Sequence, residues 1–448
     1  MSKENLRALS LDIVMEVLEK QGFSNHVLNA VLSKYQYLEK QERSFISRLS
    51  LGTIEKAPLL DEIINSYSKT KVKKQKPVIR NILRLSVYQF YFMDNVPESA
   101  VVNEAVKLAK KRGFAGLSGF VNGTLRSVIR ENKPLSEYEN QSLALKFSMP
   151  EWIVEKWSKD YGEEKTKEIL LGFSHEKGIT VRTDITKISP EKLCGLLEAE
   201  GMRVYNTEIP YAFIIDDYDY LEKSESFRNG YFYVQDLSSM EVAERADLFA
   251  GARVLDVCAA PGGKSIHMGE ILENIEKTQN RPPSSEKTGE TGSVEARDLS
   301  VDKVAIIGEN IRRTGRGNVT AKVFDATVYD ASAENYFDRV ICDLPCSGLG
   351  VIGKKPEIKY RVQPEDVLSL QTLQREILTN AVRYVKPGGM LVYSTCTITH
   401  EENDDNVAWL RKQYPQLELL SAEQFFPEKN TRDGFFIATF EFPTRAGE

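Results

Sequence analysis

Two cysteines of the sequence stand at turns where a thiol could react. Cys346 follows Pro345 and precedes a serine and a glycine, and Cys396 follows Thr395. Zinc ligation would need more cysteine or histidine at ligand spacing than the Cys342-x-x-x-Cys346 pair and four scattered histidines supply. A role as buried filler would not explain proline and glycine turns beside them. Because a thiolate is a good covalent nucleophile, the two turns predict covalent catalysis.

Methylation of a pyrimidine at C5 is a reaction that needs such a thiol. That carbon is not nucleophilic until a thiol adds to C6. The adduct then attacks a methyl donor, a base removes the C5 proton and the thiol leaves. Asp343, three residues before Cys346, can protonate or hydrogen-bond N3 of a cytosine and stabilise the adduct. The two thiols and this acid therefore predict a site for base methylation.

A third motif predicts a cofactor-binding turn. A β-branched and apolar run over residues 254–257 contains Asp256 and is followed by the small-residue turn 258–264, Cys-Ala-Ala-Pro-Gly-Gly-Lys. A helical pattern of apolar residues begins at Ile266. Small residues let backbone N–H groups approach a ligand closely, as in the first strand, turn and helix of a Rossmann-type sheet.

Acidic residues end four strands that we predict in the same part of the chain: Asp256, Asp298, Asp325 and Asp343. Ligands of parallel sheets bind outside the carboxyl ends of the strands. There is neither an arginine cluster nor a Gly-x-x-x-x-Gly-Lys-Thr/Ser turn for a triphosphate. A nucleoside with a cationic group fits better. S-adenosylmethionine is such a molecule, since carboxylates can accept from its ribose hydroxyls and amino group.

From residue 235 onward, strands and helices alternate, which predicts a parallel sheet. Besides the strand at 254–257, we expect strands at 293–298, 322–325 and 337–343. A helix over 364–384 and a turn at 386–389 should lead into a last strand, 390–396. The polar tract 275–292 is low in apolar residues and is expected to form a flexible surface excursion.

The residues before this part predict two further domains. Residues 1–140 show apolar residues at helical spacing throughout and should be all-helical. Residues 141–235 mix short strands with helices, which indicates a small α+β module, and Cys194 on an apolar helix face there is expected to be structural. We therefore expect domains at 1–140, 141–235 and 236–448, in line with roughly three domains for 448 residues.

Charge is unevenly distributed along the chain. Residues 1–150 hold 23 lysines and arginines against 15 acidic residues, although the whole chain has a net charge of −6. Basic loops at 69–76 and near 107–112 form a candidate surface for phosphate contacts, with a chance surface excess as the alternative. The basic third therefore suggests a polyanionic partner.

The composition excludes several classes of protein. With 41% hydrophobic and 28% charged residues it is ordinary for a soluble protein. No apolar run reaches the ~18 residues of a membrane span. The first residues carry no apolar core or cleavage site for secretion. Five cysteines, an odd number, favour a reducing cytoplasm over disulfides.

Three stretches together resemble the signature motifs of the Sun family of RNA cytosine-5 methyltransferases. They are residues 254–265, 343–348 and 393–398, and residues 234–239 and 433–437 also match family stretches. The helical first third resembles the NusB antitermination domain, which binds RNA. The order NusB-like domain, small α+β module, Rossmann-like class I methyltransferase domain resembles the layout of the bacterial 16S rRNA enzymes of this family. The resemblance covers nearly the whole chain.

The resemblance implies a role for each motif. It makes Cys396 the nucleophile and Cys346 the thiol that assists product release, and the substrate a cytosine of 16S rRNA, with no metal and no membrane involved. Cys258 then becomes a small residue of the cofactor turn. The residues expected to hold S-adenosylmethionine are Cys258, Ala259, Ala260, Pro261, Gly262, Gly263, Lys264, Asp298, Asp325 and Asp343.

The sequence departs from the family at three places: Met149-Pro150 replaces His-Pro, Thr183-Asp184 replaces Val-Asn, and Gly353 replaces a basic residue. We expect the last two to alter RNA contacts. The tract 275–292 is an insertion.

Three alternatives stay open. The thiol roles could be reversed, since DNA cytosine methyltransferases use a Pro-Cys nucleophile, or the protein could only bind RNA and cofactor. Methylation of an amino group is disfavoured because Cys346 stands where that chemistry usually has proline.

Overall fold

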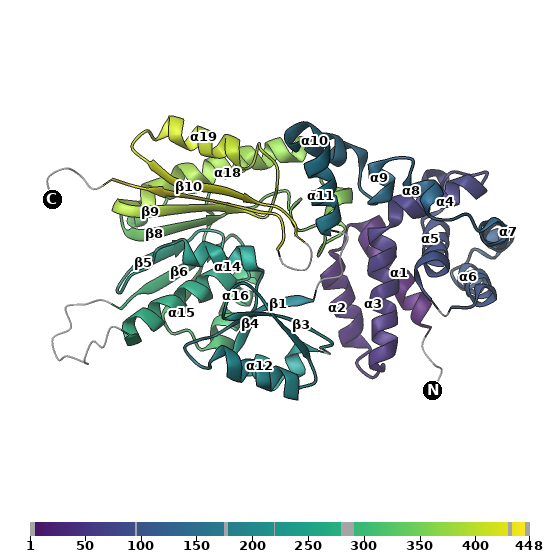
Figure 1. Cartoon of the computed structure of the whole chain (residues 1–448), viewed down its shortest axis with the longest axis horizontal. Coiled ribbons are helices and arrows are strands. Elements are labelled where there is room, and N and C mark those ends of the chain that lie inside the picture. Colours follow the sequence, from purple (N-terminus) through teal and green to yellow (C-terminus); the bar gives the residue numbers. More distant parts are fainter. Residues whose placement is uncertain are drawn as a thin grey trace. The chain divides into compact units, whose positions relative to one another are not determined.

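The computed structural model of the chain describes residues 5–94, 96–173, 178–218, 220–278, 291–428 and 432–443 (Figure 1). Contacts within the chain divide it into two compact units. The helical unit comprises Met1–Ser174 and Ile352–Gln363, and the sheet unit comprises His175–Val351 and Pro364–Glu448.

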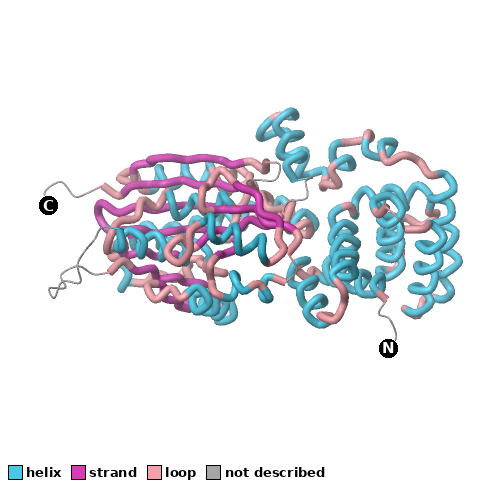
Figure 2. The backbone as a smooth tube through the Cα atoms, turned by 60° about the horizontal axis from the view of Figure 1, so that its bottom comes forward, coloured by secondary structure: helices cyan, strands magenta, loops and turns pink. Residues whose placement is uncertain are grey.

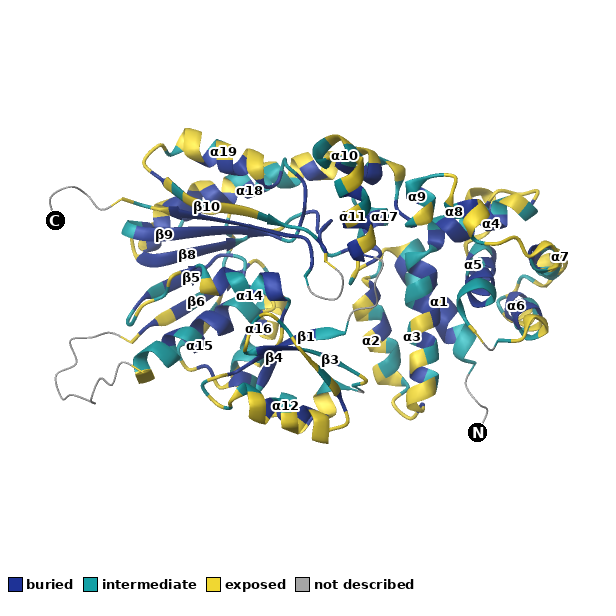
Figure 3. Cartoon of the chain, viewed as in Figure 1, coloured by how far each residue is buried: buried dark blue, intermediate teal, exposed yellow. Residues whose placement is uncertain are grey.

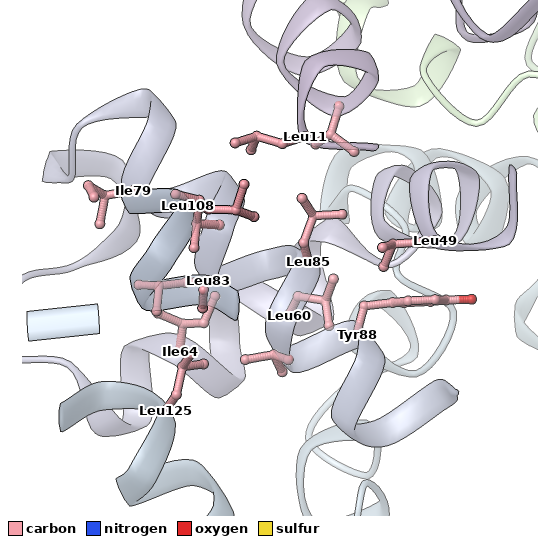
Figure 4. Close-up of a cluster of buried hydrophobic side chains, with 14 of the residues drawn as sticks. Leu11, Leu49, Leu60, Ile64, Ile79, Leu83, Leu85, Tyr88, Leu108 and Leu125 are labelled. Atoms are coloured by element: carbon pink, nitrogen blue, oxygen red, sulfur yellow. The ribbon is translucent and has the colours of Figure 1, made fainter. Parts of the chain in front are cut away.

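The helical unit is built on helices whose apolar faces meet in one core. Among its described residues the secondary structure is helical with connecting loops, and no strand occurs (Figure 2). Leu49, Leu60, Leu83 and Leu125, from four different helices, point toward one another (Figure 4). The predicted all-helical first domain is therefore confirmed. The α-helices are α1 Leu6–Lys20, α2 Ser24–Lys34, α3 Lys40–Glu55, α4 Ala57–Tyr67, α5 Pro77–Phe92, α6 Glu98–Lys111, α7 Ser118–Glu131, α8 Ser136–Glu139, α9 Leu143–Lys146, α10 Glu151–Tyr161, α11 Glu163–Phe173 and α17 Ile358–Arg361.

The segment Ile352–Gln363 belongs to the helical unit although in sequence it follows the Cys346 turn. The Lys359 ammonium donates to the Glu55 carbonyl at 2.8 Å, and the Tyr360 hydroxyl donates to the Ile54 carbonyl at 2.7 Å. The Glu357 carboxylate accepts from the backbone N–H of Ser24 at 3.1 Å. The segment therefore completes a unit whose other residues were synthesised much earlier.

A four-stranded antiparallel sheet with order β2-β3-β1-β4 opens the sheet unit and confirms the predicted α+β module. Arg182 of β1 is buried, donates to Gln235 at 2.9 Å and pairs with buried Glu270 of α15 (Gly263–Thr278). Asp184 is also buried and pairs with Arg316, so this departure from the family does not present a carboxylate at the surface. The elements are β1 Ile179–Thr183, α12 Pro190–Ala199, β2 Arg203–Asn206, β3 Ala212–Asp216, α13 Glu225–Arg228 and β4 Phe232–Val234.

The second sheet of this unit has seven strands in the order β10-β11-β9-β8-β5-β6-β7. The five from β9 to β7 are parallel, as predicted, and β11 and β10 add an antiparallel pair at one edge. Helices α18 and α19 pack on one face, and α14, α15 and α16 on the other (Figure 1). The strands are β5 Arg253–Asp256, β6 Ser293–Asp298, β7 Val319–Val323, β8 Phe337–Asp343, β9 Val385–Thr395, β10 Glu418–Phe425 and β11 Phe435–Glu441. The helices are α14 Leu237–Glu244, α15 Gly263–Thr278, α16 Val301–Thr314, α18 Pro364–Tyr384 and α19 Asp404–Gln413.

Three predicted boundaries in this sheet are wrong. Strand β7 ends at Val323, so Asp325 lies two residues beyond it. The expected turn at 386–389 is an irregularity inside β9, where Gly388 N–H donates to the Phe442 carbonyl. Residues 275–278 of the polar tract are the last residues of α15, while 279–290 lie outside the described residues.

The central strands of the seven-stranded sheet are buried, and the helices that cover the sheets are exposed on their outer sides. Figure 3 shows β8 and β9 buried between their helices, whereas α12 and α19 expose their outer faces. In the part of the chain that the structure describes, no helix has the length and apolarity to cross a membrane.

Candidate active site

The sheet brings the two predicted reactive cysteines together. Cys346 follows β8, and Cys396 follows its parallel neighbour β9, with Asp343 paired in register to Ser394. Because neighbouring parallel strands end at the same edge of a sheet, the loops after them are adjacent. The two sulfur atoms lie 3.2 Å apart, and each cysteine is only partly exposed.

The two thiols share one hydrogen bond. The hydrogen bond of Cys346 to the Cys396 sulfur, together with burial, raises the pKa of Cys346 well above that of an ordinary thiol. Either sulfur can donate the hydrogen bond that joins them.

A partly buried ion pair lies at the same edge. Lys264 Nζ donates to one oxygen of Asp343 at 2.7 Å, and the Ser394 hydroxyl donates to the other at 2.9 Å. Burial lowers the pKa of Lys264, but the Asp343 carboxylate outweighs it and the net pKa is raised. The ammonium also interacts electrostatically with Cys396. Lys264, predicted to hold the cofactor, thus pairs with Asp343, which is predicted to be catalytic, and interacts with a thiol.

The predicted cofactor turn links β5 to α15. Gly262 has a φ of +102°, a left-handed conformation that favours glycine. The Ala259 N–H donates to the Arg297 carbonyl at 2.8 Å, and the Tyr233 hydroxyl donates to the Pro261 carbonyl at 3.2 Å. Neighbouring elements therefore fix the shape of the turn.

The acids at the strand ends are placed differently from one another. Asp298 is buried, and its carboxylate accepts from the Ala260 N–H of the turn at 3.0 Å. Asp256 is fully buried beneath the turn, and burial raises its pKa to about 7. Asp325 is exposed and accepts from Thr327, which lowers its pKa. Two of the three predicted cofactor acids, Asp298 and Asp343, are therefore tied to residues of the turn.

The other cysteines of this region are not set up as nucleophiles. Burial raises the pKa of both Cys258 and Cys342. Cys194 of α12 packs at the edge of the core of the four-stranded module. Among the described residues, no group of three or more histidine, cysteine, aspartate or glutamate side chains is arranged to hold a metal ion.

Sequence reasoning missed the side chains that hold the two thiol loops. Glu402 and Asn403, which precede α19, are both fully buried within hydrogen-bonding distance of residues flanking the cysteines. Burial raises the pKa of Glu402, while donors from Ser347, Thr399 and Gln374 oppose that effect. In the sequence the pair is indistinguishable from polar residues that cap a helix.

Comparison with known families matches all three parts of the chain. Residues 247–441 match the family described as 16S rRNA methyltransferase RsmB/F. Residues 4–130 match the NusB family, and residues 149–218 match the ferredoxin-like domain of RsmF/B-like methyltransferases.

Full-length relatives and solved structures are also similar. The probable ribosomal RNA small subunit methyltransferase B of Bacillus subtilis is 35% identical, over 96% of this chain and 93% of its own length. The Proteus mirabilis ribosomal RNA small subunit methyltransferase B is 29% identical, over 97% of this chain and 98% of its own. The crystal structure of PH0851 has a TM-score of 0.82 at 25% identity, covering 98% of this chain and 99% of that chain. NSun6 from Pyrococcus horikoshii, solved with SFG, shares the fold at a TM-score of 0.55 and 22% identity, covering 65% of this chain and 98% of its own.

Proposed function

Because the chain belongs to the family of ribosomal RNA small subunit methyltransferase B, we propose that it methylates C5 of a specific cytosine in 16S rRNA through a covalent bond between Cys396 and C6. The observation that carries this proposal is the pair of sulfur atoms 3.2 Å apart beside the Asp343–Lys264 ion pair. Methylation of an amino group would need neither thiol.

The cofactor turn is suited to S-adenosylmethionine by the chemistry of its groups. Asp298 and Asp343 present carboxylates at one edge of the sheet, and each carboxylate oxygen can accept two hydrogen bonds. The structure gives Asp298 Oδ2 one such bond, from Ala260. These residues and the turn 258–264, with a lesser part for exposed Asp325, would hold the ribose and methionine parts. When bound, S-adenosylmethionine supplies an electrophilic methyl group.

The chain's own residues supply the rest of the reaction. The Cys396 thiolate forms a bond to C6, and the ring electron pair that this displaces makes C5 nucleophilic. Asp343, held by Lys264 and Ser394, hydrogen-bonds or protonates N3. After C5 gains its methyl group, a base takes the C5 proton, the electron pair of that C–H bond re-forms the C5–C6 double bond, the S–C6 bond breaks and Cys396 leaves as a thiolate. Cys346, whose sulfur lies 3.2 Å from that of Cys396, assists this release.

We assign RNA binding to the helical domain 1–140 and the module 141–235, with methyl transfer in 236–448. The lysines of the 69–76 loop support this assignment because Lys69, Lys71, Lys73, Lys74 and Lys76 are all exposed. If they contact phosphates, replacing three of them with glutamine should reduce the dependence of RNA affinity on salt. An unchanged salt slope would contradict the assignment.

Two variants test the chemistry. With tritiated methyl donor and 16S rRNA, Cys396→Ala should abolish transfer, while Cys346→Ala should accumulate an RNA–protein adduct that survives denaturing gels. Cys194→Ala, which changes a thiol outside the site, is the control. Full activity of Cys396→Ala would refute the nucleophile assignment, and the opposite pattern would support reversed roles. Absence of 5-methylcytosine in the product RNA would favour a protein that only binds.

A further inference from the structure

The loop that carries Cys346 is held on both sides of the cysteine by buried side chains. The Glu402 carboxylate accepts from the Ser347 N–H at 2.8 Å and from the Ser347 hydroxyl at 2.6 Å. The Gln374 amide donates to the Pro345 carbonyl at 2.8 Å and to Glu402 at 3.1 Å. Glu402 and Gln374 are both 0% exposed. Both chain neighbours of the cysteine are therefore fixed.

The loop that carries Cys396 is held in the same way by a different residue. Asn403, 0% exposed, accepts from the Thr395 hydroxyl at 2.6 Å. Its amide nitrogen donates to the Thr397 carbonyl at 3.1 Å and to Gln424 at 2.7 Å. One side chain thus fixes both chain neighbours of the second cysteine.

The two clamps are joined to each other. Glu402 and Asn403 are consecutive in the chain, so one peptide unit fixes their separation. The Ser347 and Thr397 hydroxyls hydrogen-bond at 2.8 Å, which ties one loop to the other. The carboxylate oxygens of Glu402 accept hydrogen bonds from neutral groups of Ser347, Gln374 and Thr399. The carboxylate is therefore used to hold the loops.

We propose that Glu402 and Asn403 are positioning residues, each for one thiol: Glu402 sets the place of Cys346, and Asn403 sets the place of Cys396. Their succession in the chain sets the separation of the two sulfur atoms. The catalytic meaning of this placement rests on the proposed function, but the placement itself does not. Neither residue needs to touch the substrate.

Thiol reactivity tests the placement without the reaction. Iodoacetamide labelling of the full chain, read by peptide mass spectrometry, gives a rate for each cysteine. Glu402→Gln replaces one of the two oxygens that accept from Ser347 with an NH2 donor at nearly constant shape, and it should change the rate of Cys346 about tenfold more than that of Cys396. Asn403→Asp removes the donors to Thr397 and Gln424 and should do the reverse. Glu270→Gln, an equally buried carboxylate elsewhere in the sheet unit, should change neither rate.

Turnover provides the second measurement. In the tritium and adduct assays, Glu402→Gln should accumulate the RNA–protein adduct, as Cys346→Ala does. Asn403→Asp should reduce methyl transfer, as Cys396→Ala does. A displacement of about 1 Å can cost up to about 10²-fold in rate, so an effect of at least tenfold is expected. Each positioning variant should resemble the variant of its own cysteine whichever thiol is the nucleophile. Wrong thiol roles would therefore show in Cys346→Ala and Cys396→Ala alone, without contradicting the positioning inference.

The outcomes are distinct. Selective effects on the matched thiol support the inference. Equal effects of both variants on both thiols, or no effect on either, overturn it, because the residues would then only stabilise the fold. If Glu402→Gln does not fold, Gln374→Met removes the other clamp of the same loop and is judged by the same criterion.

Discussion

The buried ion pair between Arg182 and Glu270 allows a prediction with a definite magnitude. Arg182 is 1% exposed and Glu270 is 3% exposed, and together they join β1 to α15. Arg182→Met would leave the Glu270 carboxylate buried without its cation. Removing one partner of a buried pair costs about 3–5 kcal/mol, because the remaining charge cannot be hydrated. We expect the free energy of opening of β1 to fall by about that amount.

Hydrogen exchange measures this loss locally. Since about 1.4 kcal/mol is a factor of ten, the β1 amides should exchange faster by a factor between about 10² and several thousand. Arg203→Met is the matched control, because Arg203 pairs with Asp216 at 3.0 Å in the same module but both side chains are about half exposed. An exposed pair contributes about 0–1 kcal/mol. Replacing both Arg182 and Glu270 with apolar residues should restore most of the loss.

The contribution of Glu270 to stability depends on pH, and the pKa shift of its carboxyl fixes the direction of that dependence. Burial raises the pKa of Glu270 to about 7 even though Arg182 lowers it. The folded chain therefore binds this proton more tightly than the unfolded chain, and the contribution of Glu270 to stability falls as pH rises from about 4.5 to 7. In Arg182→Met the loss should be larger at pH 8 than at pH 5.5. A loss equal to that of Arg203→Met, or one independent of pH, would refute the reasoning.

Three further predictions follow from other positions. A Cβ on Gly350 would lie 2.0 Å from the Gly434 carbonyl oxygen, so Gly350→Ala should abolish activity or folding, whereas Gly317→Ala has open space and should match the wild type in melting temperature and turnover. Burial lowers the pKa of Lys359 to about 7, so the folded chain holds this proton more weakly than the unfolded chain. The free energy of unfolding should therefore rise with pH between about 7 and 10, by up to about 1.4 kcal/mol per pH unit. Urea unfolding of Lys359→Met should lack that rise. Cys342→Ala should keep adduct formation while losing up to a few kcal/mol of stability in denaturant, since its buried thiol serves only the core.

Local sequence patterns were sufficient to predict most of the helices and strands. The helix predicted at 364–384 is α18, and the small-residue turn at 258–264 stands between β5 and α15 as expected. Apolar periodicity and acids at strand ends are short-range patterns, so they can be recognised without knowing which distant residues are in contact. The adjacency of Cys346 and Cys396 depends in addition on β8 and β9 being neighbours, and that strand order is set by long-range pairing that local patterns do not encode.

What the sequence could not reveal depends on contacts between distant residues. Lys264 was expected to serve the cofactor alone, but it pairs with Asp343, 79 positions later. Glu402 carries no motif of its own, and only the fold brings Ser347 and Gln374 to it. The turn expected at 386–389 lies within β9 because the Phe442 carbonyl of a neighbouring segment accepts its N–H. In each case a tertiary partner overrides the local pattern.

The segment Ile352–Gln363 has a consequence for synthesis of the protein. The helical unit begins at the first residue, yet its last piece emerges from the ribosome 189 residues after Ser174. At about 5–20 residues per second, that piece arrives roughly 10–40 s later. During this interval the acceptors for Lys359 and Tyr360 at the end of α3 are open to water. The first unit to start folding therefore cannot finish before most of the second has been made, and a gene fragment ending near Ser174 would encode an incomplete domain.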